Sequence, residues 1–271
     1  MALHSNPSLA GPGPVAASGP SPTAPRARPR GPAPKLNVQP LRWRWYAPCK
    51  AALDFALACV LTVLALPVIL LAALVVKLTS KGPAFYTQQR VGRGGKTFTI
   101  LKLRTMVDKC ESVSGPRWSV PGDPRVTRVG WLLRKTHIDE LPQLWNVLKG
   151  DMSLVGPRPE RPEFVPQLEK QLPAYRQRLN VRPGVTGLAQ VQLPPDTDVE
   201  SVRRKLAHDL YYIRHLSPWL DLKLLICTAF YSLGAPFALL SRALGVPASA
   251  KIERATRDLV PDAPVVRPRA A

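Results

Sequence analysis

The feature that most constrains this chain is a run of 22 residues without a charged side chain, from Phe55 to Val76. A helix needs about 20 apolar residues to cross the hydrocarbon core of a bilayer, so this run is long enough to enter a membrane. A buried helix of a soluble protein is the alternative, which the length and composition of the run disfavour. The sequence therefore predicts a membrane-embedded segment over residues 49–80.

Two features of this segment favour a helix that enters one leaflet and returns. Pro67 lies in its middle, where it removes a backbone donor and bends the helix axis. Lysine and arginine residues flank the run on both sides, and basic flanks normally remain in the cytoplasm. We therefore predict a re-entrant helix-break-helix with its break at Pro67 and both ends in the cytoplasm. A spanning helix with a tolerated proline kink remains the alternative.

The two ends of the chain differ from its middle in composition. Residues 1–48 hold 11 of the 31 prolines and no Asp or Glu, so this segment cannot bury enough apolar surface to offset its ordering entropy. We predict a disordered, basic leader over 1–48 and a polar tail over 251–271. The main folded unit is then expected within residues 81–250.

The net charge and the cysteine spacing limit the classes of ligand and metal that this chain is expected to bind. The net charge of +20 indicates anionic partners, and phosphorylated substrates, anionic lipid headgroups and nucleic acid all qualify. The four cysteines are scattered and form no CxxC pair, so a zinc site is not expected.

Residues 81–215 have the pattern of an α+β unit that is mostly helical. A glycine-rich turn over 92–96 separates two short strand patterns, 84–91 and 97–103, which predicts a β-hairpin. Helices are expected at 126–135, 138–149, 163–179 and 199–215. A second apolar run, 224–241, is interrupted by Gly234 and Pro236 and suits an interfacial helix, with a short second membrane helix as the alternative.

Asp139 and Glu140 are adjacent carboxylates in a basic region, because residues 81–158 carry 14 Lys and Arg against 6 Asp and Glu. Nearby cations lower a carboxylate pKa and keep the group ionised. An ionised aspartate can attack phosphorus, and a second carboxylate can help to hold a divalent metal. The plainer interpretation is that the pair favours a helix N-terminus capped by Thr136.

Three arginines are candidates for phosphate binding. Arg134 lies five residues before Asp139, and Arg158 lies between two prolines that limit its backbone freedom. Arg182 precedes a tight Gly/Pro loop in which Gly184 and Thr186 could approach a nucleotide. A solvated surface charge for each arginine, and a plain turn for the loop, are the alternatives.

Taken together, these strings resemble the bacterial sugar transferase family, the monotopic phosphoglycosyl transferases that prime polysaccharide and glycoconjugate assembly. The resemblance covers residues 48–232. Its matching runs are residues 50–54 with the apolar segment, 82–86, 89–93, 123–130, 133–136, 138–144, 146–158 and 182–190.

The resemblance implies a polyprenyl-phosphate phosphoglycosyl transferase. Asp139 would be the nucleophile and Glu140 its partner, with Mg²⁺ beside the pair. Asp139 would attack the β-phosphorus of a UDP-sugar, release UMP and pass the phosphosugar to polyprenyl (undecaprenyl) phosphate. Arg134 and Arg158 would bind phosphate. The resemblance also implies a re-entrant helix broken at Pro67, and a place on the bacterial inner membrane with the catalytic domain on the cytoplasmic face.

Two positions depart from the family pattern. Leu66 stands where the family often has a serine before the proline, which weakens support for the break. Residues 192–198 replace an Asn- and Gly-rich continuation, which puts sugar contacts in that loop in doubt.

Two other classes of protein compete with the transferase. A membrane-tethered basic nucleic-acid-binding protein would explain the charge, but no nucleic-acid module is recognisable, and it would leave Asp139 and Glu140 without a role. A scaffold that has lost catalysis is disfavoured by the intact pair. We therefore expect UDP-sugar, polyprenyl phosphate and membrane lipid as partners and no nucleic acid, with homo-oligomerisation left open.

Overall fold

The computed structural model describes residues 45–112, 115, 117–120, 122–232 and 234–260. Its α-helices are α1 Tyr46–Thr79, α2 Arg128–Lys135, α3 Leu144–Leu148, α4 Val165–Gln171, α5 Leu188–Gln192, α6 Val199–Arg214, α7 Pro218–Ser232, α8 Phe237–Ala243 and α9 Ser249–Ala255. Short 3₁₀ helices are η1 Arg93–Gly95, η2 Ile138–Gln143 and η3 Tyr175–Asn180. The strands are β1 Phe85–Val91, β2 Thr97–Leu103, β3 Ser153–Val155 and β4 Gly184–Thr186. The chain is therefore mostly helical with small sheets, as predicted.

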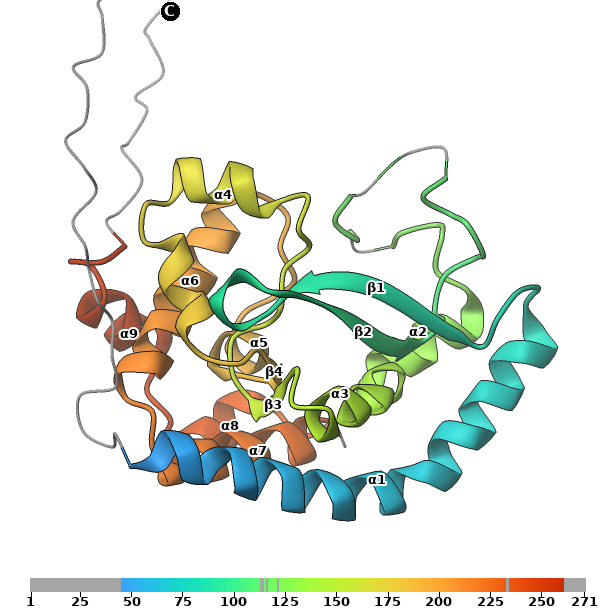
Figure 1. Ribbon diagram of the computed structural model, residues 1–271, viewed down its shortest axis with the longest axis horizontal. Helices are drawn as coiled ribbons and strands as arrows, with labels where there is room; N and C mark the ends of the chain where they lie inside the picture. Colours follow the sequence, from blue (N-terminus) through green and yellow to red (C-terminus); the bar gives the residue numbers. More distant parts are fainter. Residues whose placement is uncertain (1–44, 113–114, 116, 121, 233, 261–271) are drawn as a thin grey trace, which may run out of the picture. The chain divides into compact units, whose positions relative to one another are not determined.

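The apolar run lies in α1, which continues through Pro67 as one helix and bends along its length (Figure 1). The predicted helix-break-helix is thus a bent, unbroken helix, because proline removes only its own donor and its fixed φ is compatible with a helix. Among the described residues, α1 alone is long and apolar enough to cross a membrane, and only 17% of its most apolar window is buried. That exposure sets it apart from the core helix of a soluble protein.

Both ends of α1 pack on the same body of helices and strands. Near its start, buried residues recur every four positions at Tyr46, Lys50, Asp54 and Ala58, which places them on one face of the helix. Near its end, Ala72 and its neighbour Val76 pack with a second cluster that contains Leu103 of β2 and Leu133 of α2. The helix therefore returns to the domain from which it starts.

The hairpin forms as predicted. β1 pairs antiparallel with β2, with Val91 opposite Thr97 and Phe85 opposite Leu103. Gly94 and Gly95 in the turn have φ of 67° and 83°, which glycine adopts without a Cβ clash. A second, smaller sheet pairs β3 with β4 in parallel.

The predicted helices are found with two changes, both at prolines. The expected helix at 163–179 ends at Gln171 and resumes as η3, because Pro173 cannot donate within a helix. The expected helix at 138–149 begins as the 3₁₀ helix η2, which contains Pro142, and only then becomes α3. The α6 helix keeps its predicted bounds to within one residue and starts with a capping box of Asp198 and Ser201.

The second apolar run divides as its glycine and proline suggest: α7 ends at Ser232, and Pro236 precedes α8. Beyond it, α9 crosses the predicted boundary at residue 250, and Ile252, Leu259 and Val260 are buried in the main core. Residues 1–44 of the predicted leader lie outside the described residues. Its last three residues, 46–48, belong to α1.

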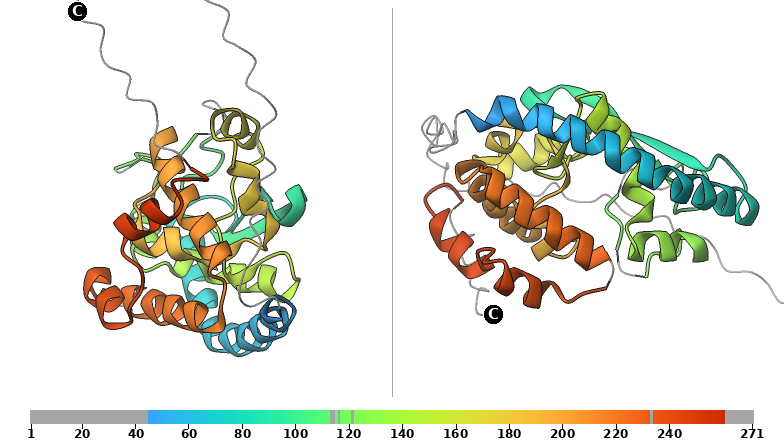
Figure 2. Two further views of the ribbon diagram at one scale, coloured as in Figure 1. Left: turned by 90° about the vertical axis from the view of Figure 1, so that its left-hand side faces the viewer. Right: turned by 90° about the horizontal axis from the view of Figure 1, so that it is seen from below.

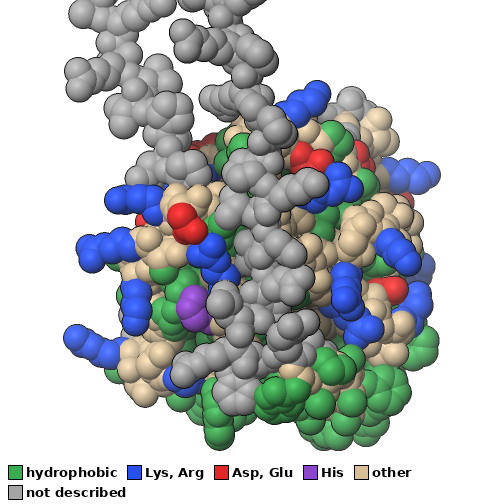
Figure 3. Space-filling model, turned by 60° about the vertical axis from the view of Figure 1, so that its left-hand side comes forward, with side chains coloured by type: hydrophobic (Ala, Val, Ile, Leu, Met, Phe, Trp, Pro, Cys, Tyr) green, Lys and Arg blue, Asp and Glu red, His purple; other side chains and the backbone are tan. Residues whose placement is uncertain are grey.

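Helices α1, α7 and α8 lie along one side of the domain, where they are seen together from below (Figure 2). Large apolar side chains are exposed on all three, at Leu71 and Leu78 of α1, Trp219 and Phe230 of α7 and Leu239 of α8. Hydrophobic side chains gather along the lower edge of the molecule in Figure 3, whereas most of the Lys and Arg side chains in that view are scattered above that edge. This face has the composition that suits a membrane surface.

Candidate active site

The carboxylate pair lies on η2, after a sharp turn at the end of α2. Thr136 Oγ1 donates a hydrogen bond to the carbonyl of Leu132 at 2.9 Å. The threonine therefore closes the C-terminal end of α2, and the alternative in which it caps a helix that carries the pair is wrong. His137 then adopts a left-handed backbone with φ 57°, which reverses the chain before Asp139. The turn sets η2 against β2 and α1.

Glu140 forms ion pairs with two cationic side chains of the site. Its Oε1 accepts hydrogen bonds from Lys102 Nζ and Arg158 Nη2, both at 2.7 Å. Burial raises the pKa of this carboxyl, but Arg158 and Lys102 together outweigh burial and hold the pKa of Glu140 well below its usual range. Glu140 is therefore ionised and fixes the two cations in place.

Asp139 is 7% exposed, and its carboxylate accepts no hydrogen bond from any residue that the structure describes. Burial and the charge of Glu140 raise its pKa to about 6. The expectation that surrounding cations keep the pKa of both carboxylates low is therefore wrong for Asp139. Lys102, Arg134 and Arg158 still lower its pKa, but burial and the charge of Glu140 raise it more. With a pKa of about 6, Asp139 is still about 90% ionised at pH 7. The site thus holds an ionised carboxylate whose oxygens are free to react.

Arg134 projects from α2 and is held by neutral groups. Its Nε donates to Thr105 Oγ1 and its Nη1 to Ser119 Oγ, both at 2.9 Å. Burial lowers its pKa, while the charge of Asp139 raises it. No carboxylate of a described residue forms an ion pair with it. Its positive charge is therefore oriented but not neutralised, as a phosphate-binding group requires.

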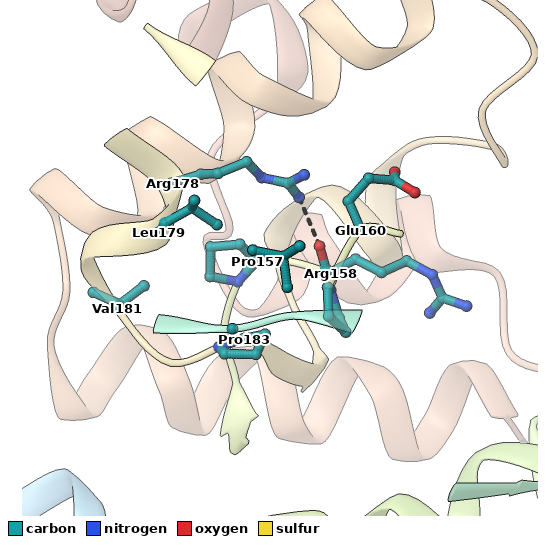
Figure 4. A pocket seen from close by; sticks show the side chains of 10 residues that line it. Pro157, Arg158, Glu160, Arg178, Leu179, Val181 and Pro183 are labelled. Atoms are coloured by element: carbon teal, nitrogen blue, oxygen red, sulfur yellow. Dashed lines mark hydrogen bonds between the residues drawn. The ribbon is translucent and has the colours of Figure 1, made fainter. Parts of the chain in front are cut away.

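Arg158 lies in the loop after β3, and its main chain is fixed independently of its side chain. Arg178 Nη2 donates to the Arg158 carbonyl at 2.8 Å, and the Arg158 guanidinium extends away from that contact (Figure 4). A Cβ at Gly156 would collide with the backbone of Arg182 and Gly184, so only glycine permits this close packing. The side chain of Arg158 remains 42% exposed and can meet a ligand.

The predicted nucleotide loop lies beside this arginine, inside a sheet. Gly184 and Thr186 belong to β4, and both are buried. Gly184 N donates to the carbonyl of Pro157 at 2.9 Å, and the hydroxyl of Thr186 lies 2.7 Å from that of Thr228. These contacts support the Arg158 loop and anchor it to α7. The side chain of Arg182 lies near Gly150, and Gly150 belongs to the turn that precedes β3. A nucleotide contact for these three residues remains a prediction.

Sequence reasoning missed Lys102, which shares Glu140 with Arg158. Its signal is a lysine between two leucines of a strand, and Lys102 is 15% exposed at the side chain. Side chains of a strand alternate between its two faces, so the position of Lys102 in the strand pattern 97–103 could have predicted the face of the hairpin on which it lies. Sequence reasoning also missed the buried ion pair between Arg178 and Asp209, at 2.7 Å, because the partners lie 31 positions apart.

The donor set for a metal is small. Within the part of the chain that the structure describes, no three His, Cys, Asp or Glu side chains converge. Asp139 and Glu140 offer two adjacent carboxylates, and the carboxylate oxygens of Asp139 accept no hydrogen bond from the described residues. Mg²⁺ is usually held by one or two carboxylates together with water and substrate phosphates. The residues present therefore fit Mg²⁺ bound jointly with a phosphorylated substrate.

Comparison with known proteins shows the family of the chain. The family model for "Bacterial sugar transferase" matches residues 45–234, and the chain belongs to this family. It is 48% identical over 214 residues to a UDP-glucose:undecaprenyl-phosphate glucose-1-phosphate transferase of Caulobacter vibrioides, which covers 78% of this chain and 76% of the relative.

Two further relatives carry a different sugar, N-acetylgalactosamine, in their names. A UDP-N-acetylgalactosamine-undecaprenyl-phosphate N-acetylgalactosaminephosphotransferase of Aeromonas hydrophila is 45% identical over 183 residues, which are 68% of this chain and 43% of that relative. A putative undecaprenyl-phosphate N-acetylgalactosaminyl 1-phosphate transferase of Bacillus subtilis is 49% identical over 134 residues, 49% of this chain and 74% of the relative. The chain thus spans less than half the length of the Aeromonas relative.

Proposed function

We propose that this protein transfers a sugar 1-phosphate from a UDP-sugar to undecaprenyl phosphate and releases UMP, as the first step of exopolysaccharide or glycoconjugate synthesis. The observation that carries the proposal is Asp139: a buried, ionised carboxylate without a hydrogen bond among described residues, next to three cations. The names of the relatives support the same reaction class. Membership of the family supports transferase activity at a bacterial membrane.

The reaction proceeds in two displacements at one phosphorus atom. In the first, an Asp139 oxygen forms a bond to the β-phosphorus, and the bond from that phosphorus to the bridging oxygen breaks, so UMP leaves with the electron pair. In the second, an oxygen of undecaprenyl phosphate attacks the same phosphorus, and the Asp139 carboxylate leaves. A covalent route suits one unpaired nucleophile, because it does not need both substrates bound together.

The cations of the site are placed for the charge that this chemistry develops. Arg134 approaches the pair from α2, whereas Arg158 and Lys102 approach from the side of Glu140. Fixed cations stabilise a phosphoryl group in transfer without reorganisation at the moment of reaction. Asp139 and Glu140 would hold Mg²⁺ together with the substrate, and the ion would supply neutralisation of phosphate charge.

The two attachments of α1 support a placement in one leaflet of the membrane. Tyr46 OH donates to Asp221 of α7 at 2.8 Å at one end of the helix, and Val76 packs with Leu103 and Leu133 at the other. Because both ends are attached to one domain, a helix that dips into one leaflet fits better than one that crosses the bilayer. We therefore place the domain on the cytoplasmic face, where UDP-sugars are made, with α7 and α8 in the interface.

The test is a single-turnover assay on the detergent-solubilised full chain. UDP-sugar without acceptor should release up to one equivalent of UMP per enzyme, and the peptide that contains Asp139 should gain the mass of a phosphosugar. Addition of undecaprenyl phosphate should then give continuous turnover with ping-pong kinetics. Intersecting double-reciprocal lines without a UMP burst would contradict the covalent route and leave Asp139 as a base or a metal ligand.

A further inference from the structure

The guanidinium of Arg134 is held by the segment that connects β2 to α2, residues 104–127. Its Nε donates to Thr105 near the start of this connecting segment, and its Nη1 donates to Ser119 further along, both at 2.9 Å. Its Nη2 donates to no described residue. Two of the three nitrogens are therefore fixed by the protein, and the third remains for a ligand.

The Ser119 hydroxyl links Arg134 to a carboxylate. Arginine offers only donors, so Ser119 Oγ accepts from Arg134. The same hydroxyl donates its proton to Asp123 Oδ2, which lies 3.4 Å away. An ionised carboxylate only accepts, so the direction of these two hydrogen bonds is fixed. Ser119 therefore relates the position of the Arg134 guanidinium to that of Asp123.

Asp123 is itself held by Arg125. Arg125 Nε donates to Asp123 Oδ1 at 2.9 Å, Arg125 Nη2 donates to Oδ2 at 2.6 Å, and the backbone N of Arg125 donates to Oδ1 at 3.0 Å. These contacts outweigh burial and hold the pKa of Asp123 well below its usual range. Because Arg125 neutralises Asp123, the charge of Arg134 stays available to a phosphate.

The backbone on both sides of Ser119 is attached to its surroundings. Thr127 N donates to the Thr105 carbonyl at 3.0 Å, and Val107 N donates to the Arg125 carbonyl at 2.9 Å. A Cβ at Gly130 of α2 would collide with the Thr105 carbonyl, so only glycine lets the helix approach so closely. The two stretches that supply the acceptors are therefore joined to each other and to α2.

We propose that Ser119, held by Asp123, is a positioning residue that directs the Arg134 guanidinium at the phosphorus attacked by Asp139. The inference rests on the proposed function, because the direction of Arg134 affects a rate only if a phosphoryl group is transferred at Asp139. Thr105 alone would leave the guanidinium free to turn about one contact, whereas two contacts fix its plane. Misplacement of such a group by about 1 Å can lower a rate about 100-fold.

The experiment compares Ser119→Ala with Ser112→Ala in the full chain. The first removes the acceptor of Arg134 Nη1. The second removes a hydroxyl from an exposed position of the same segment, where it donates to the carbonyl of Lys109 at 2.8 Å. Each variant is assayed for the single-turnover burst of UMP from UDP-glucose or UDP-N-acetylgalactosamine, whichever the wild type uses faster. The dependence on donor concentration gives a burst rate constant and an apparent dissociation constant.

We expect Ser119→Ala to lower the burst rate constant by about 5- to 20-fold, because one hydrogen bond to a charged group is lost while the other remains. The apparent dissociation constant should change by less than about threefold, since the direction of Arg134 matters most in the transition state. Ser119→Thr keeps the hydroxyl and should restore the rate constant, and Ser112→Ala should match the wild type. If Ser119→Ala does not fold, Ser119→Val replaces it, because valine has the shape of threonine without the hydroxyl.

A double-mutant cycle separates positioning from support of the fold. Because Ser119 acts through Arg134, Ser119→Ala added to Arg134→Ala should leave the burst rate constant within about twofold of Arg134→Ala alone. Losses that multiply in the double variant would overturn the inference, and so would a Ser119→Ala burst equal to that of the wild type. A wild-type enzyme that releases UMP from neither donor would instead refute the proposed function, and the inference with it.

Discussion

Two clusters of buried carboxylates lie in this domain, and they differ in how many hydrogen bonds each carboxylate accepts. The first joins the start of α1 to α7 and β3 through Asp54 and Asp221, and each of the four oxygens accepts a hydrogen bond. The second is the pair on η2, where Glu140 accepts every contact and Asp139 none from described residues. Burial is similar, so the difference lies in the partners.

The first cluster has the contacts of a structural joint. Asp221 accepts from Lys50 at 2.6 Å, from Tyr46 at 2.8 Å and from Tyr212 at 2.7 Å, while Asp54 accepts from Ser153 at 2.6 Å. A buried charge that is paired and fully hydrogen-bonded can persist without reaction. This cluster fastens the membrane helix to the domain.

The second cluster keeps one carboxylate in an unfavourable state. A buried, unpaired charge costs stability, and that cost is commonly found where a reactive group is needed. The two clusters therefore differ in the number of hydrogen-bond partners and not in burial, and we expect the carboxylate without partners, Asp139, to be the reactive one.

The sharpest way to break the comparison is Asp139→Asn. Because an amide is a poor nucleophile at phosphorus, the UMP burst and steady-state turnover should both fall by at least about 10³-fold. The variant should nevertheless remain folded. Thermal melting in detergent and the single-turnover assay measure the two effects on one preparation. Retention of turnover within tenfold would remove Asp139 from the chemistry.

The same variant carries a stability prediction whose sign follows from the pKa. The folded-state pKa of Asp139, about 6, exceeds the unfolded value near 3.9, so ionisation of this group destabilises the fold as pH rises from about 4 to about 6. Asp139→Asn should therefore raise the free energy of unfolding at pH 7 by up to about 3 kcal/mol and change it little at pH 4. A destabilised variant at pH 7 would mean that Asp139 has a structural partner.

The structural cluster gives the opposite expectation. Asp221→Ala leaves the Tyr46 hydroxyl without its acceptor. It also removes the shorter hydrogen bonds of Lys50 and Tyr212, which keep only Asp54 and the Val155 carbonyl as acceptors. Loss of one partner of a buried pair costs about 3–5 kcal/mol. The melting temperature should fall strongly. Asp258→Ala is the matched control, because the ion pair of Asp258 with Arg214 is exposed and should contribute less than about 1 kcal/mol. An equal fall in melting temperature for the two variants would show that the Asp221 cluster does not hold α1 to the domain.

The comparison also marks what sequence reasoning could reach. The hairpin and α6 follow from local periods and turn residues, and so does the existence of the membrane helix. The three misjudgements all concern prolines: Pro67 does not break α1, whereas the helices expected at 163–179 and 138–149 change form at Pro173 and Pro142. Asp139, Glu140, Arg134 and Arg158 were predicted from the sequence as site residues, and the structure brings Arg158 into contact with Glu140. Their division of labour was not predicted, because it depends on Lys102 from a distant strand reaching Glu140 and not Asp139.

Arg158→Lys tests the cation side of the reactive cluster. Lysine keeps the charge but loses the planar fork that reaches Glu140 through two nitrogens, so we expect kcat/KM to fall by about 30- to 100-fold. Arg93→Lys in the exposed hairpin turn is the control and should stay within twofold. Equal kinetics for the two variants would show that any cation suffices at position 158.

The pH dependence of the burst sharpens the role of the pair. Only ionised Asp139 attacks phosphorus, so the burst rate should rise about tenfold per pH unit below about 6 and level off above it. Glu140→Gln removes the negative charge that helps to raise this pKa, so the residual activity should level off at a lower pH. Stopped-flow or quenched-flow measurement of UMP between pH 4.5 and 8 checks both profiles. An unshifted profile in Glu140→Gln would assign the titration to another group.

The smallest effect is expected at Pro67, in the part of α1 that lies between its two attachments. Pro67→Ala supplies an N–H for the Val63 carbonyl and favours a straight helix, which at 34 residues would be about 51 Å long. Tyr46 and Lys50 at one end, and Ala72 and Val76 at the other, oppose that straightening by holding the helix to the domain. We therefore expect turnover to fall by no more than about threefold and most molecules to keep both ends on the cytoplasmic side. Labelling of Lys81→Cys in a background without the native cysteines, with Arg93→Cys as the reference for the domain, measures the side on which α1 ends. If Lys81→Cys becomes accessible only from the opposite side in Pro67→Ala, the proline and not the two attachments sets the topology.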